Sequence, residues 1–204
     1  MNLFNSENAF TGIEAAIVLI TFVSVAAFFS YVFISTGFFT TQTAQGTMNT
    51  GMQKVSSSMD LIGDVYGIKG STTNIRYINV TVALTAGGTP MDISAMVVSY
   101  TDDNGGHNAN LLPSNPNDMF DCGTIATTDA TTDSRWCIGQ KTNGATPTSA
   151  TLDDYAHMVI MVGVNSATAT PNTKIKVNFQ PAVGAVLPIT RTIPSSINPV
   201  QPLY

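Results

Sequence analysis

The sequence predicts an α+β protein, with a long N-terminal hydrophobic α-helix followed by an Ig-like antiparallel β-sandwich. Residues 13–39 are almost continuously apolar, and no charged residue occurs from Ala15 to Gln53. After about residue 68 the pattern changes to short alternating runs separated by turn signals, which is typical of strands. We therefore expect a leader over 1–9, a helix over 10–67 and a β-sandwich domain over 68–204.

The composition is typical of a secreted or surface-assembled protein. Only 10% of the 204 residues are charged, well below the usual quarter. The formal net charge of −5 argues against a nucleic-acid partner, because phosphates need a basic surface. These features favour one sizeable domain with an apolar appendage.

The apolar run is long enough to cross a bilayer, for which about 20 residues suffice. Polar residues such as Thr21, Ser24 and Ser30 interrupt it, and they do not form a polar stripe. Such a helix must be enclosed on all sides, either by lipid or by copies of itself. Beyond the run, apolar residues from Met48 to Tyr66 recur at steps of 3 and 4, so we expect the helix to continue to residue 67.

The first nine residues differ from an ordinary secretory signal, which has a basic start and a small-residue cleavage site after its apolar stretch. Met1 to Ala9 is short and polar and lacks Lys and Arg, and the small residue Ala9 precedes the apolar run. Cleavage between Ala9 and Phe10 would leave the helix on the mature protein. We therefore predict that this helix has a permanent role.

Glu14 is an isolated carboxylate at the start of the apolar run. A charged side chain within hydrocarbon costs about 3 kcal/mol or more and marks a functional position. At the level of the lipid headgroups, the same charge would favour the helix N-terminus.

Four segments of the C-terminal region alternate like half-buried strands. They are 75–84, 96–100, 156–164 and 173–179. In 156–164 the second face is also apolar, with Val159 and Met161, so a neighbouring subunit would cover it.

Three features of this region are candidate sites. Cys122 and Cys137 are the only cysteines, which favours a disulfide in an exported domain, with buried free thiols as the alternative. Asn79 lies in the only N-x-S/T sequon, on the polar face of its strand, and is either glycosylated or buried by a neighbour. Residues 102–106 fit a turn better than a calcium site, because the EF-hand pattern fails at Pro113.

No catalytic signature is present: G-x-S-x-G, P-loop and dinucleotide motifs are absent, and His107 and His157 each stand alone in the sequence. No cysteine or histidine lies close enough in sequence to complete a metal site with the two cysteines. The sequence therefore predicts a protein with no enzymatic activity, cofactor or metal.

Several stretches resemble archaellins (archaeal flagellins), a branch of the type IV pilin-like superfamily. One of them is the apolar helix followed by residues 37–47. The N-terminus Phe10-Thr11-Gly12-Ile13-Glu14 resembles the processed end left by a class III signal, with Glu14 as the fifth mature residue. Residues 78–103 resemble the family's first hairpin, and residues 174–194 its last two strands, with a turn at 181–184. The leader departs from the usual pattern because it lacks basic residues.

The resemblance implies an extracellular filament of the archaellum, inserted in the membrane as a precursor and rotated for swimming motility. Its subunits would polymerise through their N-terminal helices, with Gly12 and Glu14 in processing and assembly, and Glu14 pairing with the amine of Phe10 on a neighbouring subunit. The implied partners are a prepilin-peptidase-like signal peptidase and a membrane motor and assembly platform. One alternative is a type IV pilin-like adhesion filament, which uses the same helix for a different task. Another is a single-pass anchored β-ectodomain that never polymerises.

Overall fold

The structure, a computed structural model of the chain, describes residues 5–71, 73–127, 134–144, 146 and 148–204, with the backbone alone for 5–11 and 53–56. The chain divides into two compact units, Met1–Thr50 and Gly51–Tyr204. The second unit, which we call the β-domain, contains all the strands that the structure describes.

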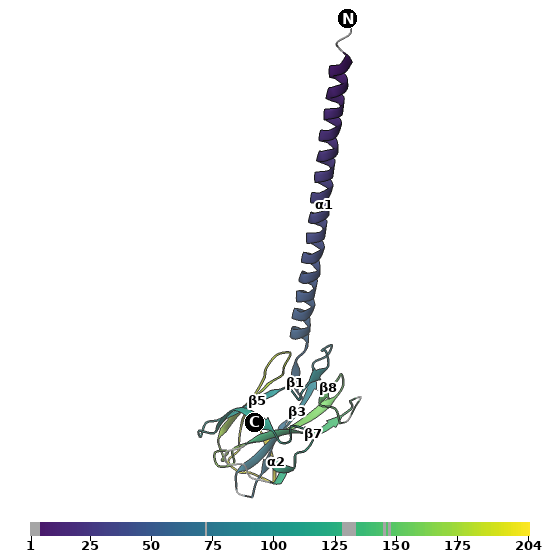
Figure 1. Cartoon of the computed structure of the whole chain (residues 1–204). Helices are drawn as coiled ribbons and strands as arrows, with labels where there is room; N and C mark the ends of the chain where they lie inside the picture. The colour runs from purple at the N-terminus through teal and green to yellow at the C-terminus, as the bar shows by residue number, and fades with distance from the viewer. Residues whose placement is uncertain (1–4, 72, 128–133, 145, 147) are drawn as a thin grey trace. The chain divides into compact units, whose positions relative to one another are not determined.

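Helix α1 extends over Asn5–Ser56 as one uninterrupted element (Figure 1). Its 52 residues correspond to about 78 Å at 1.5 Å per residue. The apolar run 13–39 is helical throughout, as the sequence predicts.

The prediction that the helix continues to residue 67 is wrong. After Ser56 the chain forms strand β1 (Met59–Leu61) and strand β2 (Val65–Lys69), both paired with β3 (Ile75–Leu84). Pairing with β3 buries Met59 and Val65 in the core. An isolated helix would leave these two side chains exposed to solvent. Tertiary burial thus overrides the local helical periodicity.

The remaining elements are short. They are β4 (Met91–Asp92), β5 (Val97–Asp102), β6 (His107–Pro113), α2 (Gly123–Thr127), β7 (Arg135–Thr142), β8 (Thr151–Leu152), β9 (His157–Gly163), β10 (Lys174–Gln180), β11 (Leu187–Thr192) and β12 (Val200–Leu203). The four predicted strands correspond to β3, β5, β9 and β10, and the predicted turn at 181–184 joins β10 to β11.

A single sheet of ten strands dominates the β-domain, in the order β11-β10-β5-β6-β7-β9-β3-β2-β12, with β1 also paired to β3. All its pairs are antiparallel except β6 with β7, which are parallel through a short bridge at Leu112 and Arg135. At the two edges, the backbone N–H of Thr192 donates to the carbonyl of Tyr204, and the N–H of Tyr204 donates to the carbonyl of Thr192. The sheet is therefore a nearly closed, barrel-like sheet.

This architecture corrects the expectation of an Ig-like, wholly antiparallel sandwich. The alternation in single strands correctly indicates one buried face, and two facing groups of strands do exist, β11-β10-β5-β6 and β7-β9-β3-β2-β12. The short β6–β7 bridge and the Thr192–Tyr204 contact join these groups into one sheet. Contacts of one or two residues leave no periodic signal in the sequence.

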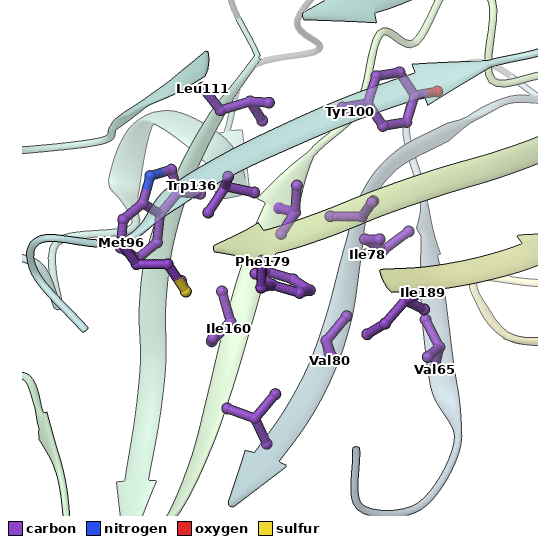
Figure 2. Close-up of a cluster of buried hydrophobic side chains, with 14 of the residues drawn as sticks. Val65, Ile78, Val80, Met96, Tyr100, Leu111, Trp136, Ile160, Phe179 and Ile189 are labelled. Carbon is purple, nitrogen blue, oxygen red and sulfur yellow. The ribbon is translucent and has the colours of Figure 1, made fainter. Parts of the chain in front are cut away.

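The core lies inside this sheet (Figure 2). Ile78 and Val80 of β3 and Ile160 of β9 face the same interior as Tyr100 of β5 and Phe179 of β10. These side chains are all at most 1% exposed. Burying each large apolar side chain contributes about 2 kcal/mol, so the β-domain carries its own stabilising core.

Candidate functional site

Helix α1 exposes most of its apolar side chains. The segment Gly12–Met52 is long and apolar enough to cross a membrane, and 0% of its most apolar stretch is buried. Phe22, Tyr31 and Phe33 are 74%, 72% and 76% exposed. Exposure of large apolar side chains on every side indicates that another partner must bury this helix.

Eight hydroxyl side chains of α1 form hydrogen bonds within the helix. The hydroxyls of Thr21, Ser24 and Thr36 each donate to the carbonyl four residues earlier, at 2.8 Å. Five further threonines between residues 40 and 50 do the same, at 2.9 Å. Because these hydroxyls need no water, the helix suits either lipid or dry packing against other helices.

One side of α1 carries a groove. It is lined by Tyr31, Ile34, Ser35, Phe38, Phe39 and Gln42. Grooves between large side chains accept the side chains of a second helix, as in knobs-into-holes packing. This part of α1 can therefore interlock with another helix.

The predicted processing residues lie at the start of α1. Gly12 and Glu14 are exposed, and no atom lies within 4 Å of the position that a Cβ on Gly12 would take. Ala9 and Phe10 belong to the helical backbone, but their side chains lie outside the described residues. Cleavage between them stays a prediction.

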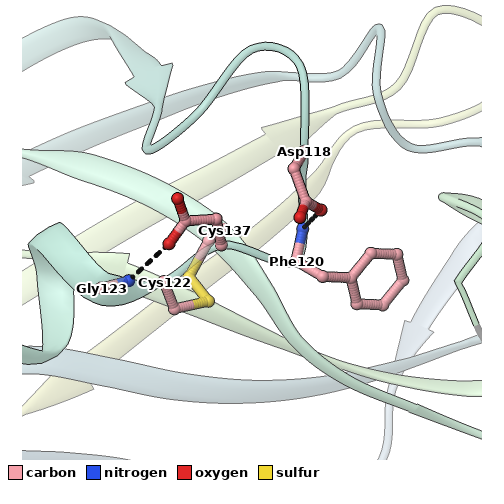
Figure 3. Close-up of a disulfide and its surroundings, with 6 residues drawn as sticks. Asp118, Phe120, Cys122, Gly123 and Cys137 are labelled. Carbon is pink, nitrogen blue, oxygen red and sulfur yellow. Dashed lines mark hydrogen bonds between the residues drawn. A yellow bond between two sulfur atoms is a disulfide. The ribbon is translucent and has the colours of Figure 1, made fainter.

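The predicted disulfide is confirmed (Figure 3). Cys122 and Cys137 are bonded, with their Cα atoms 5.5 Å apart, and the bond joins the start of α2 to β7. Next to it, the backbone N–H of Gly123 and the amide of Asn115 donate to the Asp121 carboxylate, and these bonds lower the pKa of Asp121. Part of the loop between the cysteines, 128–133, lies outside the described residues.

We predict that replacing both cysteines by alanine lowers the free energy of unfolding by about 3 kcal/mol, the chain-entropy value for a loop of this length. The measurement is thermal or denaturant unfolding with and without a reducing agent. Reduction should destabilise the natural chain and leave the double variant unchanged. Equal stability of the natural chain in both conditions would contradict the prediction.

A buried carboxylate organises the hairpin between β5 and β6. Asp102 is only 6% exposed and accepts hydrogen bonds from the Tyr100 hydroxyl at 2.7 Å, the Asn104 N–H at 3.0 Å and the Gly106 N–H at 2.7 Å. The Thr168 hydroxyl also donates to it. Burial, and then the bond to Asp102, raise the pKa of Tyr100 far above its ordinary value, so the tyrosine stays a neutral donor.

The segment 102–106 is thus a turn closed around a carboxylate, as the sequence predicts. Across the parts of the chain that the structure describes, no group of three or more His, Cys, Asp or Glu side chains is placed to hold a metal ion. The sequence did contain a signal for the burial of Asp102, because this residue is in phase with the inward-facing Val98 and Tyr100 on β5.

The sequence pattern does not predict a second buried polar contact, between Lys141 and Asp153. The Lys141 side chain is 0% exposed, and its Nζ lies 2.7 Å from the Asp153 carboxylate. The Nζ also donates to the carbonyl of Thr151 at 2.6 Å. The bulge in β7 between Ile138 and Gln140 breaks the strand alternation, so the sequence pattern does not indicate that Lys141 points inward.

The sequon residue Asn79 lies in the middle of β3, opposite Tyr66 on one side and Met161 on the other. Its side chain is half-buried, and its Oδ1 is enclosed without a hydrogen-bond partner. Outward-facing Val159 and Met161 are also half-buried. Glycosylation of Asn79 stays a prediction, to be checked by mass spectrometry of the native protein.

These features define a class of protein. A long helix with exposed apolar residues is joined to a β-domain with a core of its own. Such a chain is a subunit whose helix must be buried by lipid or by other copies.

The comparisons identify the family within that class. A model of the archaeal-type flagellin family matches residues 9–191. Probable flagellin 1 of Archaeoglobus fulgidus is 34% identical over 209 residues, which cover 100% of this chain and 98% of the relative. The chain belongs to the archaeal-type flagellin family, a family of structural proteins, and it is not an enzyme.

Solved structures agree with this assignment. The archaeal flagellum of Methanospirillum hungatei strain JF1 is similar with a TM-score of 0.65 and 25% identity, over 94% of this chain and 98% of that one. The crystal structure of archaeal flagellin FlaB1 from Methanocaldococcus jannaschii has a TM-score of 0.52 and 20% identity, over 72% and 96% of the two chains. The second likeness concerns the fold alone.

Proposed function

We propose that this chain is the repeating subunit of an archaeal flagellum filament that serves swimming motility. The observation that carries the proposal is the uncovered helix over Gly12–Met52, in a chain that resembles a flagellum subunit over 94% of its length. Helix–helix contact in the filament replaces lipid contact in the membrane, so the apolar surface stays buried while subunits leave the bilayer. The β-domains form the outer layer of a filament at the cell surface.

Processing belongs to the same proposal. A prepilin-peptidase-like signal peptidase cuts between Ala9 and Phe10, and the new amine of Phe10 pairs with Glu14 of a neighbouring subunit. An assembly platform and motor in the membrane add subunits and rotate the filament. Mass spectrometry of isolated filaments should find mature chains that begin at Phe10.

Swimming speed and surface filament number should be measured together in native cells that lack the gene. Loss of both, restored by the gene, is the expected result. Normal swimming with fewer filaments and poorer attachment would instead identify an adhesion filament. No change in either property would contradict a filament role.

A further inference from the structure

The exposed charges of the β-domain are separated along the strand direction. The strand registers define two ends of the domain. At one end, β3 finishes at Leu84 and β9 begins near His157. At the other end, β3 begins at Ile75, β2 finishes at Lys69 and β10 begins at Lys174.

The first end is acidic. Asp60 pairs with Ala83, which in turn pairs with the first residue of β9, and Asp92 of β4 pairs with Thr151 of β8. We define the acidic end as the exposed residues Asp60, Asp92 and Asp154. Among the side chains that the structure describes, the one lysine or arginine at this end is Lys141, which is buried against Asp153.

The opposite end is basic. We define it as Lys69, Lys174, Lys176 and Arg191. Lys174 pairs with Thr192, and Arg191 pairs with Ile175, so the two cationic residues lie on adjacent strands. Lys174 and Lys176 are exposed, and within the described part of the chain neither forms an ion pair. Asp103 is an exposed carboxylate beside this end, since its backbone N–H donates to the carbonyl of Lys174, whereas Asp102 is buried.

A strained, exposed aromatic residue adjoins the acidic end. Tyr155 is 88% exposed and has a φ of 62°, in a turn that the bond from the Ala156 N–H to the Asp153 carbonyl closes. The left-handed region is costly for a residue with a large side chain, and such strain is retained mainly at functional positions. A tyrosine ring beside carboxylates is suited to contact a lysine or arginine.

We propose that the acidic end, with Tyr155, docks on the basic end of a second copy of this chain in the filament. The inference rests on the proposed function, because a filament of indefinite length needs two different, mutually complementary surfaces on each subunit. The two ends carry an excess of opposite charge, and within the described residues Lys174 and Lys176 form no ion pair. Complementary charge also sets the orientation of each added subunit.

Two charge reversals test this docking. Lys174→Glu with Lys176→Glu makes both ends acidic, and Asp60→Lys with Asp154→Lys makes both ends basic. After a fixed shear, each variant should give filaments with a median length reduced by about threefold or more, as expected for the loss of several exposed pairs. Added salt should shorten the natural filaments toward the same length, because it screens the contact.

Net charge alone predicts a different result. The lysine reversal takes the formal net charge from −5 to −9, and the aspartate reversal takes it from −5 to −1. If general repulsion governed filament length, the aspartate variant would form longer filaments. The chain with all four changes regains a net charge of −5 and complementary ends, so its filaments should recover their length.

Lys174→Arg with Lys176→Arg is the matched control and should keep the natural length. Unfolding temperatures of extracted subunits establish that each variant folds. Natural filament length in both charge-reversal variants would overturn the docking proposal and leave the proposed function intact. Failure of the natural chain to form filaments would overturn both.

Discussion

Replacing Phe28 with lysine is expected to abolish filament formation. Phe28 lies within the uncovered apolar part of α1 and is 66% exposed. A lysine at the centre of a membrane helix costs about 3 kcal/mol on insertion, and the same charge would be buried again in every subunit of a helical core. Electron microscopy of surface filaments measures the effect, and Phe28→Leu is the matched control because it keeps the position apolar.

A second substitution separates membrane insertion from helix packing. Ala27→Phe leaves the helix apolar, so the precursor should still reach the membrane, but it enlarges a side chain that would face other helices. We expect the precursor to accumulate in the membrane fraction while filament number falls. Natural filament numbers in both Phe28→Lys and Ala27→Phe would show that α1 is not the assembly surface.

Replacing Asp102 with alanine is expected to destabilise the β-domain by about 3 kcal/mol, because buried donors would lose a charged acceptor. The Tyr100 hydroxyl and the N–H groups of Asn104 and Gly106 would lose their shared partner. The free energy of unfolding of subunits extracted from the membrane measures the loss.

Asp103→Ala provides the control for this substitution. Asp103 is the next residue and is also an aspartate, but its side chain is exposed. The Asp103→Ala substitution should change the free energy of unfolding by less than about 0.5 kcal/mol, as surface substitutions usually do. Equal effects of the two substitutions would contradict the structural role of Asp102.

The helix and the main strands could be predicted from the sequence because each has a strong local signal. The apolar run 13–39 has no polar stripe, and β3 and β10 alternate with period two. The end of α1 could not be predicted. The residues from Met59 to Tyr66 fit a helical stripe, and only their pairing with β3 turns them into strands.

Closure of the sheet depends on contacts between residues far apart in the sequence. The parallel bridge of Leu112 with Arg135 and the bonds between Thr192 and Tyr204 involve very few residues. Pro188 in β11 and Pro202 in β12 lie in the two edge strands, which is typical of edges protected against further pairing. The prolines therefore indicate that these two strands are edges. They do not indicate that the two edges meet.

The candidate sites also differ in whether a local signal in the sequence predicts them. The disulfide follows from two cysteines in an exported domain and is confirmed. Asn79 illustrates the opposite case, because the sequon is visible in the sequence but the enclosure of its Oδ1 depends on neighbouring strands. The separation of charge between the two ends is also hidden in the sequence, since Asp60 and Asp154 come together only through β3 and β9.

The most direct test of the assembly mechanism is electron cryomicroscopy of filaments sheared from native cells. We predict a core of closely packed helices into which α1 fits from Phe10 onward, surrounded by β-domains with the fold described above. Filaments without a helical core, or a chain found only in the membrane fraction and never in filaments, would contradict the account.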